Sequence, residues 1–245
     1  MKSKSILQYL LIVVAVFIGN AVCAQKYKIL VFSKTAGYHH GSIAVGVPAL
    51  QKMGIDNKFG VDTTTDAAQF SPQNLKKYAA VVFLNTTGDV LGDEQQKAFE
   101  QYIKAGGGFV GVHAATDTEY EWPWYGKLVG AYFVKHPAQQ MADLHVINRK
   151  SISTKHLPAT WSRKDEWYNF KEINPDLKVL IELDESTYSG GMNGAHHPMA
   201  WYHDYDGGRA FYTGLGHVDD SYTDPLFLKH LLGGIQYAMG QKRME

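Results

Sequence analysis

A histidine stands at the end of a short apolar run, in the stretch GFVGVHAATD that covers residues 108–117. Apolar runs of this length that follow a glycine cluster are typical of buried strands in a parallel sheet. In open α/β sheets the reactive groups lie just beyond the carboxyl ends of such strands. His113 is therefore placed where a base or nucleophile is expected, and an imidazole changes its charge most easily near neutral pH.

Other histidines follow predicted strands in the same way. The chain has eleven histidines, among them His40 after the first strand and His217 after a late one. A single histidine is more often structural, but several at one rim of a sheet indicate a shared site. We therefore predict that His40, His113 and His217 line one pocket at the carboxyl edge of the sheet. Asp117 either orients the His113 imidazole, acts as a base itself or caps the next segment.

Histidines combined with carboxylates can also hold a divalent metal such as zinc. The candidate ligands are His40, His113 and His136, although no spacing such as His-Glu-x-x-His supports them. No phosphate loop or nucleophile elbow is present, since Gly106-Gly107-Gly108 precedes a strand and no serine lies in Gly-x-Ser-x-Gly. The metal prediction therefore rests on residue type and not on a ligand spacing.

Aromatic residues next to charges could bind a sugar, with a flat ring against apolar faces and polar groups that fix its orientation. The alternative for each of them is packing in the core. We predict that Trp122, Trp124 and Trp167 form a wall of the histidine pocket. The wider set of candidate substrate-binding residues comprises Tyr38, His40, Trp122, Trp124, Tyr125, Glu166, Trp167 and Tyr168.

The elements that must position these residues alternate between strands and helices. Strands are expected at 28–33, 79–84 and 108–112, with helices at 42–53, where Gly54 is the expected stop, and at 93–104. A hairpin turns at Asp206-Gly207-Gly208, and the last helix begins at Asp224. This pattern predicts an α/β fold with a mainly parallel sheet and helices on both faces, in one domain over residues 26–241.

The first 24 residues have the pattern of a signal peptide: Lys2 and Lys4, an apolar run over 6–18, and small residues up to Ala24. We expect cleavage there, a periplasmic or secreted protein, and no membrane contact afterwards. A single-span anchor and lipidation at Cys23 are the competing interpretations. Cys23 is the only cysteine, so the mature chain would have no thiol nucleophile and no disulfide. Basic and acidic residues are equal in number at 24 each, which argues against nucleic acid as a partner.

Four motifs, in order, resemble the ThuA-like (trehalose utilisation) family. They are GYHHGSI at 37–43, GVHAATDT at 111–118 with WPWY at 122–125, DEWYNF at 165–170, and PMAW at 198–201 running to YTGLGH at 212–217. The family often has Gly-Phe-Arg-His in the first motif, so Tyr38 and His39 depart from it while His40 is kept. The resemblance implies a flavodoxin-like three-layer sandwich of the class I glutamine amidotransferase-like superfamily. His113 stands where those enzymes have their cysteine, so glutaminase chemistry is excluded.

The resemblance also implies a role in sugar catabolism, near oxidoreductases that make 3-keto sugars. The first hypothesis is an exported enzyme that acts on a glucoside or 3-keto-glycoside by acid/base elimination or hydrolysis, with or without a metal. His113, Asp117 and His217 would be catalytic, and His40 would help to polarise the carbonyl group. The second hypothesis is a non-catalytic sugar-binding protein on the same scaffold. Both take a carbohydrate as partner and are compatible with a homo-oligomer.

Overall fold

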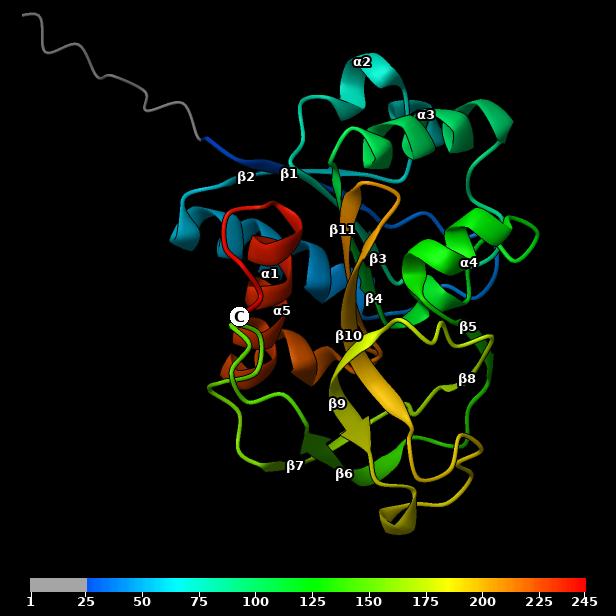
Figure 1. Ribbon diagram of the computed structural model, residues 1–245, viewed down its shortest axis with the longest axis vertical. Coiled ribbons are helices and arrows are strands. Elements are labelled where there is room, and N and C mark those ends of the chain that lie inside the picture. Colours follow the sequence, from blue (N-terminus) through cyan, green and yellow to red (C-terminus); the bar gives the residue numbers. More distant parts are fainter. Residues whose placement is uncertain (1–25) are drawn as a thin grey trace, which may run out of the picture.

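The computed structural model describes residues 26–245, so the predicted signal peptide and Cys23 lie outside the described residues. Nine strands of the described chain form one sheet, β5 and β8 form a small second sheet, and helices pack around them (Figure 1). No helix in residues 26–245 combines the length and apolar character needed to cross a bilayer. In chain order, the strands and helices are β1 (Lys28–Phe32), α1 (Ile43–Asn57), β2 (Gly60–Thr64), α2 (Pro72–Leu75), β3 (Ala80–Leu84), α3 (Asp93–Lys104), β4 (Gly108–Val112), α4 (Pro123–Val129), β5 (Tyr132–Lys135), β6 (Gln140–Val146), β7 (Thr160–Asp165), β8 (Asn169–Lys171), β9 (Lys178–Leu183), β10 (Pro198–Tyr205), β11 (Gly208–Thr213) and α5 (Pro225–Ala238).

The large sheet has the strand order β2-β1-β3-β4-β11-β10-β9-β6-β7. The pairings from β2 to β11 are parallel and those from β11 to β7 are antiparallel. Because only β10 and β6 run against the rest, seven strands point the same way and end at a common edge. The predicted class, an α/β fold with a mainly parallel sheet, is confirmed.

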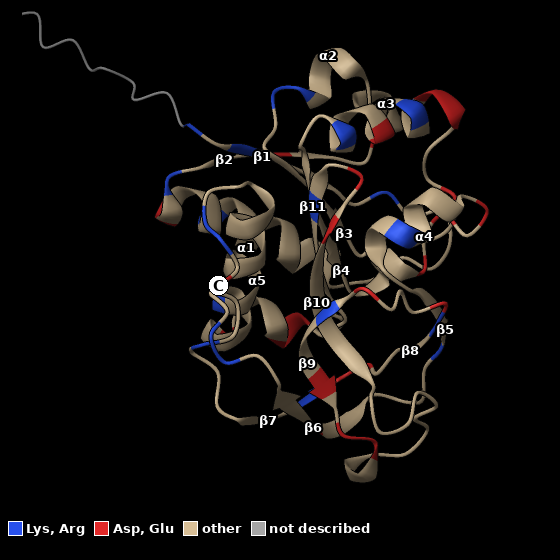
Figure 2. Ribbon diagram, viewed as in Figure 1, with Lys and Arg blue, Asp and Glu red and all other residues tan. Residues whose placement is uncertain are grey.

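The central strands are apolar because both of their faces are covered. Every residue of β3 and of β4 is buried, as expected for strands between two helical layers. Helices α1 and α5 lie on one side of the sheet, and α3 and α4 lie on the other (Figure 1). Charged residues lie mainly on the outer helices and loops, away from β3 and β4 (Figure 2). Sheet and helices thus form the three expected layers.

Helix α1 extends beyond the stop that the sequence predicts. Gly54 lies inside the helix, which ends at Asn57 with Lys58 in the left-handed conformation. A Cβ atom at Gly54 would lie 2.5 Å from the Val61 side chain and 2.7 Å from the Phe59 carbonyl oxygen. The expectation of a stop at Gly54 is therefore wrong, because this glycine provides room for β2 to pack against the helix.

The antiparallel half curls back toward the parallel half. Strand β7 is five positions from β4 in the sheet, a separation of about 24 Å if the sheet were flat. Nevertheless, Glu166, directly after β7, contacts His113, directly after β4. Strong coiling of the sheet therefore brings its last strand over the carboxyl edge of the central strands, near the lower part of Figure 1.

Candidate metal and active site

The structure brings His40, His113 and His217 together at the carboxyl edge of the sheet. The three imidazole centroids are 5.0 to 5.1 Å apart, and each pair of rings meets edge to face. Each histidine follows a parallel strand: His40 comes after β1, His113 directly after β4, and His217 after β11. Because these strands point the same way, their carboxyl ends place the three side chains at one location.

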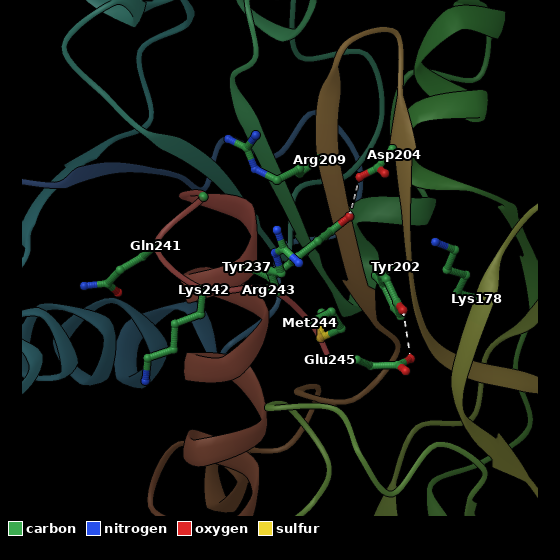
Figure 3. Close-up of a pocket in the computed structure, with 11 residues that line it drawn as sticks. Lys178, Tyr202, Asp204, Arg209, Tyr237, Gln241, Lys242, Arg243, Met244 and Glu245 are labelled. Atoms are coloured by element: carbon green, nitrogen blue, oxygen red, sulfur yellow. Dashed lines mark hydrogen bonds between the residues drawn. The ribbon is translucent and has the colours of Figure 1, made fainter.

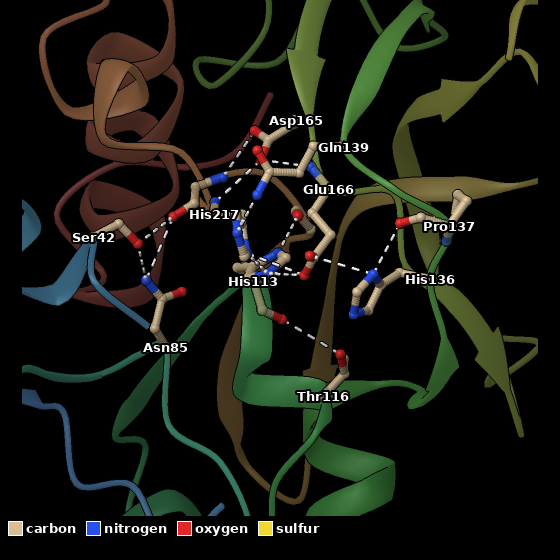
Figure 4. A network of polar contacts seen from close by, with 12 residues as sticks. Ser42, Asn85, His113, Thr116, His136, Pro137, Gln139, Asp165, Glu166 and His217 are labelled. Carbon is tan, nitrogen blue, oxygen red and sulfur yellow. Dashed lines mark hydrogen bonds and ion pairs between the residues drawn. The ribbon is translucent and has the colours of Figure 1, made fainter. Parts of the chain in front are cut away.

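Glu166 completes the group from the antiparallel half of the sheet (Figure 4). Its Oε2 atom lies 3.4 Å from Nε2 of His113 and 3.0 Å from Nδ1 of His217. The same two nitrogens are 3.2 Å apart. Three basic atoms thus form a nearly equilateral triangle. Below, the "His/Glu centre" means His40, His113, Glu166 and His217.

The backbone determines which nitrogen of His113 faces this triangle. Nδ1 lies 2.9 Å from the carbonyl oxygen of Gly214, so Nδ1 carries the proton and donates it. Nε2 of the neutral ring therefore presents a lone pair toward Glu166 and His217. His113 has a φ of 47°, a left-handed conformation that is uncommon outside glycine and frequent at functional sites. The turn after β4 thus holds the imidazole in a defined position and tautomer.

Gln139 contacts the other ring nitrogen of His217. Its side-chain nitrogen lies 2.7 Å from Nε2, so the amide N–H donates to that nitrogen and Nδ1 carries the proton. Nδ1 then donates this proton to Glu166. With the amide rotated by 180°, its oxygen would accept from Nε2 and leave the Nδ1 lone pair free. Gln139 can therefore support either tautomer of His217.

With both histidines neutral, the triangle contains no positive charge. At most one proton lies among its three basic atoms when both histidines are neutral, so the lone pair of His113 faces the carboxylate. Ligands bound at 2.0–2.1 Å in a tetrahedral zinc site lie about 3.3 Å apart. The three separations of 3.0, 3.2 and 3.4 Å match that spacing. One divalent cation could satisfy all three atoms at once.

His40 has the properties of a fourth ligand. It is 2% exposed, and its Nδ1 atom has no hydrogen-bond partner among the described residues. Burial, and then the neighbouring His113 and His217, lower the pKa of His40 to about 3. The ring is therefore neutral at physiological pH, as a metal ligand must be. One ligand atom from each residue of the His/Glu centre lies within 4.8 Å of all the others, so these residues fit a divalent metal.

The carboxylate of Glu166 is held in its charged form. Burial alone would raise its pKa, but His113 and His217 together outweigh burial and hold that pKa well below its usual range. Its second oxygen, Oε1, lies 3.3 Å from Nδ1 of His136. His136 is 39% exposed at its side chain and lies outside the His/Glu centre. The metal-ligand assignment of His136 is thus corrected: Glu166 takes the place predicted for it.

Tyr168 and Tyr38 contact rings of the His/Glu centre, and Asp117 lies within electrostatic range of His113. The Tyr168 ring packs 4.2 Å from the His113 ring and is buried. Tyr38 is 66% exposed, with its ring edge-on to His40 at 4.9 Å. Asp117 accepts a hydrogen bond from Tyr120, and burial raises the pKa of its carboxyl group. These residues supply an apolar wall, an exposed ring and a carboxyl group near His113.

The predicted tryptophan wall is not found at the centre. The Trp122 and Trp124 rings stack on each other, and their indole N–H groups bind Glu100 in α3 and Asp206 in the β10–β11 turn. Tyr125 is buried among core phenylalanines and donates to the carbonyl oxygen of Ala115. Their substrate-binding assignment is therefore corrected to packing away from the centre, with Trp122 and Tyr125 buried and Trp124 half-buried, because each polar group already has a protein partner.

Trp167 is also a packing residue. It is fully buried and donates its indole N–H to the carbonyl oxygen of Gln140, so it has no free donor for a sugar. Successive side chains along residues 165–168 point to opposite sides of the chain, which explains why neighbouring residues have different surroundings. Glu166 and Tyr168 face the His/Glu centre, whereas Trp167 points away from it toward β6.

Sequence reasoning missed two residues that hold the centre in place. Asp165 is fully buried and accepts hydrogen bonds from the backbone of Gly216 and His217. Gln139 binds the ring of His217. Asp165 lies within the DEWYNF segment, one of the four motifs that resemble the ThuA-like family, whereas no local signal marks Gln139. Both act across distances in the chain that no local pattern reveals.

A sizeable cavity of the described chain lies away from the His/Glu centre. It has a volume of about 720 Å³ and is lined by residues of the C-terminal tail, α5, β9, β10 and β11 (Figure 3). Two of its tyrosines are engaged with acids, since Tyr237 donates to Asp204 and Tyr202 to Glu245. This cavity contains no residue of the His/Glu centre, so the chemistry of the site depends on residue type and geometry, not on cavity size.

Fold and site together define an α/β protein with a buried His/Glu centre at the carboxyl edge of a mainly parallel sheet. The family model for ThuA, described as trehalose utilisation, matches residues 28–238. The chain therefore belongs to the ThuA family, which is linked to sugar utilisation. No protein with a curated description matches the chain significantly.

Solved structures share the fold. A ThuA-like protein from Bacteroides uniformis is 24% identical, with a TM-score of 0.76, and the match covers 93% of this chain and 97% of that one. A ThuA-like protein from Parabacteroides merdae is 22% identical, with a TM-score of 0.73 and coverage of 89% and 92%. A β-galactosidase from Bacillus circulans is 14% identical, with a TM-score of 0.58; the match covers 87% of this chain and 31% of that enzyme.

Proposed function

We propose that this protein is an exported sugar-processing enzyme whose His/Glu centre holds a divalent metal such as zinc. One observation carries the proposal: Nε2 of His113, Nδ1 of His217 and Oε2 of Glu166 lie 3.0 to 3.4 Å from one another. These separations match those of three ligand atoms in one tetrahedral zinc site, so a divalent cation at their centre would contact all three atoms at once. The neutral, buried His40 supplies a fourth donor beside them.

The substrate class follows from the family link and from carbohydrate chemistry. ThuA membership connects the chain to sugar utilisation, and a glucoside or a 3-keto-glycoside is the substrate that we infer. In a 3-keto sugar, the hydrogen at C2 is acidic because the carbonyl at C3 stabilises the enolate. When bound, a divalent metal supplies a Lewis acid that stabilises such developing negative charge.

Asp117 is the residue that we propose as the base. In its ionised form it takes the C2 proton, and the electron pair of the C–H bond becomes the enolate. The enolate pair then expels the aglycone from C1, and the leaving oxygen takes the proton that Asp117 removed from C2, which regenerates the carboxylate. Burial raises the pKa of Asp117, which makes its carboxylate a stronger base than an exposed one. The exposed Tyr38 ring beside His40 is positioned to contact the sugar.

The test combines metal content, binding and turnover. Purified protein is dialysed, its bound metals are measured by plasma mass spectrometry, and disaccharides and their 3-keto forms are assayed with and without a chelator. We expect about one divalent ion per chain and turnover that the chelator abolishes. Protein that binds no ion would refute the metal centre. Sugar binding without turnover of any compound would instead identify a sugar-binding protein.

A matched pair of variants connects the result to the site. His217→Gln removes a ligand atom, whereas His196→Gln changes a histidine that is 89% exposed at its side chain and contacts Glu182 outside the centre. We expect His217→Gln to lose the ion and at least about 100-fold in turnover, and His196→Gln to retain both. Equal metal content in the two variants would reject His217 as a ligand.

A further inference from the structure

The segments that carry Glu166 and His217 come from distant parts of the chain. The Gly216 and His217 amides and Asp165 are separated by 51 and 52 residues, and their strands β7 and β11 are four positions apart in the sheet. A flat sheet would separate such strands by about 19 Å. Some contact must therefore hold the two segments at the distance that the His/Glu centre requires.

Asp165 makes that contact with both oxygens of one buried carboxylate (Figure 4). Oδ1 accepts from the amide of Glu166 at 3.0 Å and from the amide of His217 at 3.1 Å. Oδ2 accepts from the amide of Gly216 at 3.1 Å and lies 3.4 Å from the Arg163 guanidinium. The carboxylate thus joins the backbone of two residues of the centre without contacting its ligand atoms.

Gly216 makes this arrangement possible. Its φ of +111° is a conformation that residues with a Cβ atom rarely adopt, and a Cβ there would lie 3.0 Å from the Tyr222 hydroxyl. This turn points two successive amides, those of Gly216 and His217, at the same carboxylate. Successive N–H groups of this kind form a concave anion site. Here the anion is a side chain of the same protein.

We propose that Asp165 is a positioning residue that sets the distance between the Glu166 and His217 ligand atoms and thereby the metal affinity of the centre. The affinity measurement rests on the proposed metal centre. The hydrogen bonds by which Asp165 joins the two segments, called the clasp below, do not depend on any metal. Asp165 acts through the backbone, so its loss should weaken metal binding while the four ligand side chains remain present.

The test compares Asp165→Asn with Asp224→Asn. Both remove a carboxylate partner of Arg163, since Asp165 contacts Nη2 of that guanidinium and Asp224 lies 3.3 Å from its Nη1. Asp224 caps α5, and asparagine is an equally good N-cap, so this control leaves the helix and the Gly216 turn in place. In Asp165→Asn, the amide NH₂ faces either the Glu166 and His217 amides or the Gly216 amide and the Arg163 guanidinium, so at least one hydrogen bond is replaced by opposed donors.

Two measurements decide the outcome: zinc affinity by competition with a chelating dye, and hydrogen exchange at the Gly216 and His217 amides without metal. We expect Asp165→Asn to lose at least about tenfold in zinc affinity, the scale of outer-shell effects, and to exchange these amides faster. Asp224→Asn should match wild type in both. Unchanged exchange in Asp165→Asn overturns the proposal, as does unchanged affinity where wild type binds zinc.

If wild type binds no zinc, the proposed function fails and the exchange measurement alone decides whether Asp165 clasps the segments. If Asp165→Asn does not fold, Gly216→Ala tests the same contact from its other side, because it disturbs the turn and keeps the carboxylate. In that variant, faster exchange at His217 supports the clasp, and unchanged exchange rejects it.

Discussion

Nε2 of His113 and Nδ1 of His217 lie 3.2 Å apart although 104 residues separate them in the chain. Neighbouring parallel strands β4 and β11 produce this closeness, because Val112 pairs with Thr213 and each histidine follows shortly after. His113 donates from Nδ1 to the Gly214 carbonyl oxygen in the segment that leads to His217. The two imidazoles are therefore positioned as a pair by one register of the sheet.

Two substitutions of His113 distinguish the role of its imidazole from the effect of its left-handed backbone conformation. Asparagine tolerates the φ of 47°, whereas a β-branched residue is strained there. We expect His113→Asn to lose the bound ion and at least about 100-fold in turnover while it unfolds near the wild-type temperature without metal. His113→Val should lose the ion and about 1–2 kcal/mol of stability. Full activity in His113→Asn would reject His113 as part of the reaction centre.

Glu166→Gln tests the role of the negative charge. The amide keeps the size of the side chain but presents no anion to His113 and His217, so we expect zinc affinity to fall by at least about 100-fold. Glu185→Gln is the matched control, because Glu185 contacts the buried His197 at 2.8 Å in a similar pair outside the centre. Equal zinc affinity in both variants would contradict the role of Glu166 as a ligand.

His40 predicts a pH dependence of stability in the metal-free protein. Its folded pKa of about 3 lies below the ordinary value of 6.5, so between these values the unfolded chain binds a proton that the folded chain does not. Stability must fall as pH decreases through this window, by up to about 1.4 kcal/mol per pH unit for this group. Urea titrations with a chelator at pH 6.5 and 5 should show a smaller decrease for His40→Gln than for wild type.

The neighbouring His39 provides the control for that measurement. It is exposed, so His39→Gln should retain the wild-type decrease. His230, whose pKa burial also lowers to about 3, leaves a residual decrease in every variant. A His40→Gln protein with the full wild-type decrease between pH 6.5 and 5 would show that His40 is protonated in the folded state.

Gln139 should control the tautomer of His217. In Gln139→Glu, the carboxylate accepts the proton of Nε2 and leaves the Nδ1 lone pair for a metal, so zinc should bind as tightly as in wild type or more tightly. Gln139→Leu removes the partner of Nε2, and affinity should fall by about tenfold, as for other outer-shell groups. Calorimetric titration with zinc measures both variants, and weaker binding by Gln139→Glu than by Gln139→Leu would contradict this assignment.

Trp124 and Tyr38 should have opposite effects on sugar binding and on stability. Trp124 is anchored to Asp206 and stacked on Trp122, so Trp124→Leu should cost about 1–3 kcal/mol of stability and leave sugar affinity unchanged. Tyr38→Ala removes an exposed ring beside His40 and should weaken sugar binding without loss of stability. Calorimetry with the preferred sugar, and thermal unfolding, measure the two effects.

The strands and site residues that depend on local sequence pattern could be predicted. The contacts that depend on the curl of the sheet could not. Buried strands β3 and β4 are visible as apolar runs, so the placement of His113 could be predicted. Strand β7 was not predicted, because two of its inward-facing residues are charged: Arg163 and Asp165 occupy buried positions beside Trp161. Without β7 in place, Glu166 could be named as a site residue but not as the partner of His113 and His217.

The tryptophans were predicted to line the site, but the structure places them elsewhere. Trp122 and Trp124 precede or begin a short helix next to a site motif, which suggested a binding wall. Their partners are Glu100 and Asp206, from segments that local pattern does not bring together. An aromatic residue near a motif in sequence can face the opposite way once a turn intervenes, so proximity in sequence does not determine the direction of a side chain.

The origin of Glu166 has a consequence for the order of assembly. Three ligands arise from the parallel strands, but the carboxylate arrives only when β7, the last strand of the sheet, has curled into place. Before the antiparallel half of the sheet has packed in place, the three imidazoles lack the Glu166 carboxylate. Such a partly folded chain would bind a metal ion only weakly. If the complete centre binds an ion as proposed, that ion would oppose global unfolding by RT ln(1 + [M]/Kd). The ions available where the chain finishes folding would then influence which of them occupies the proposed site.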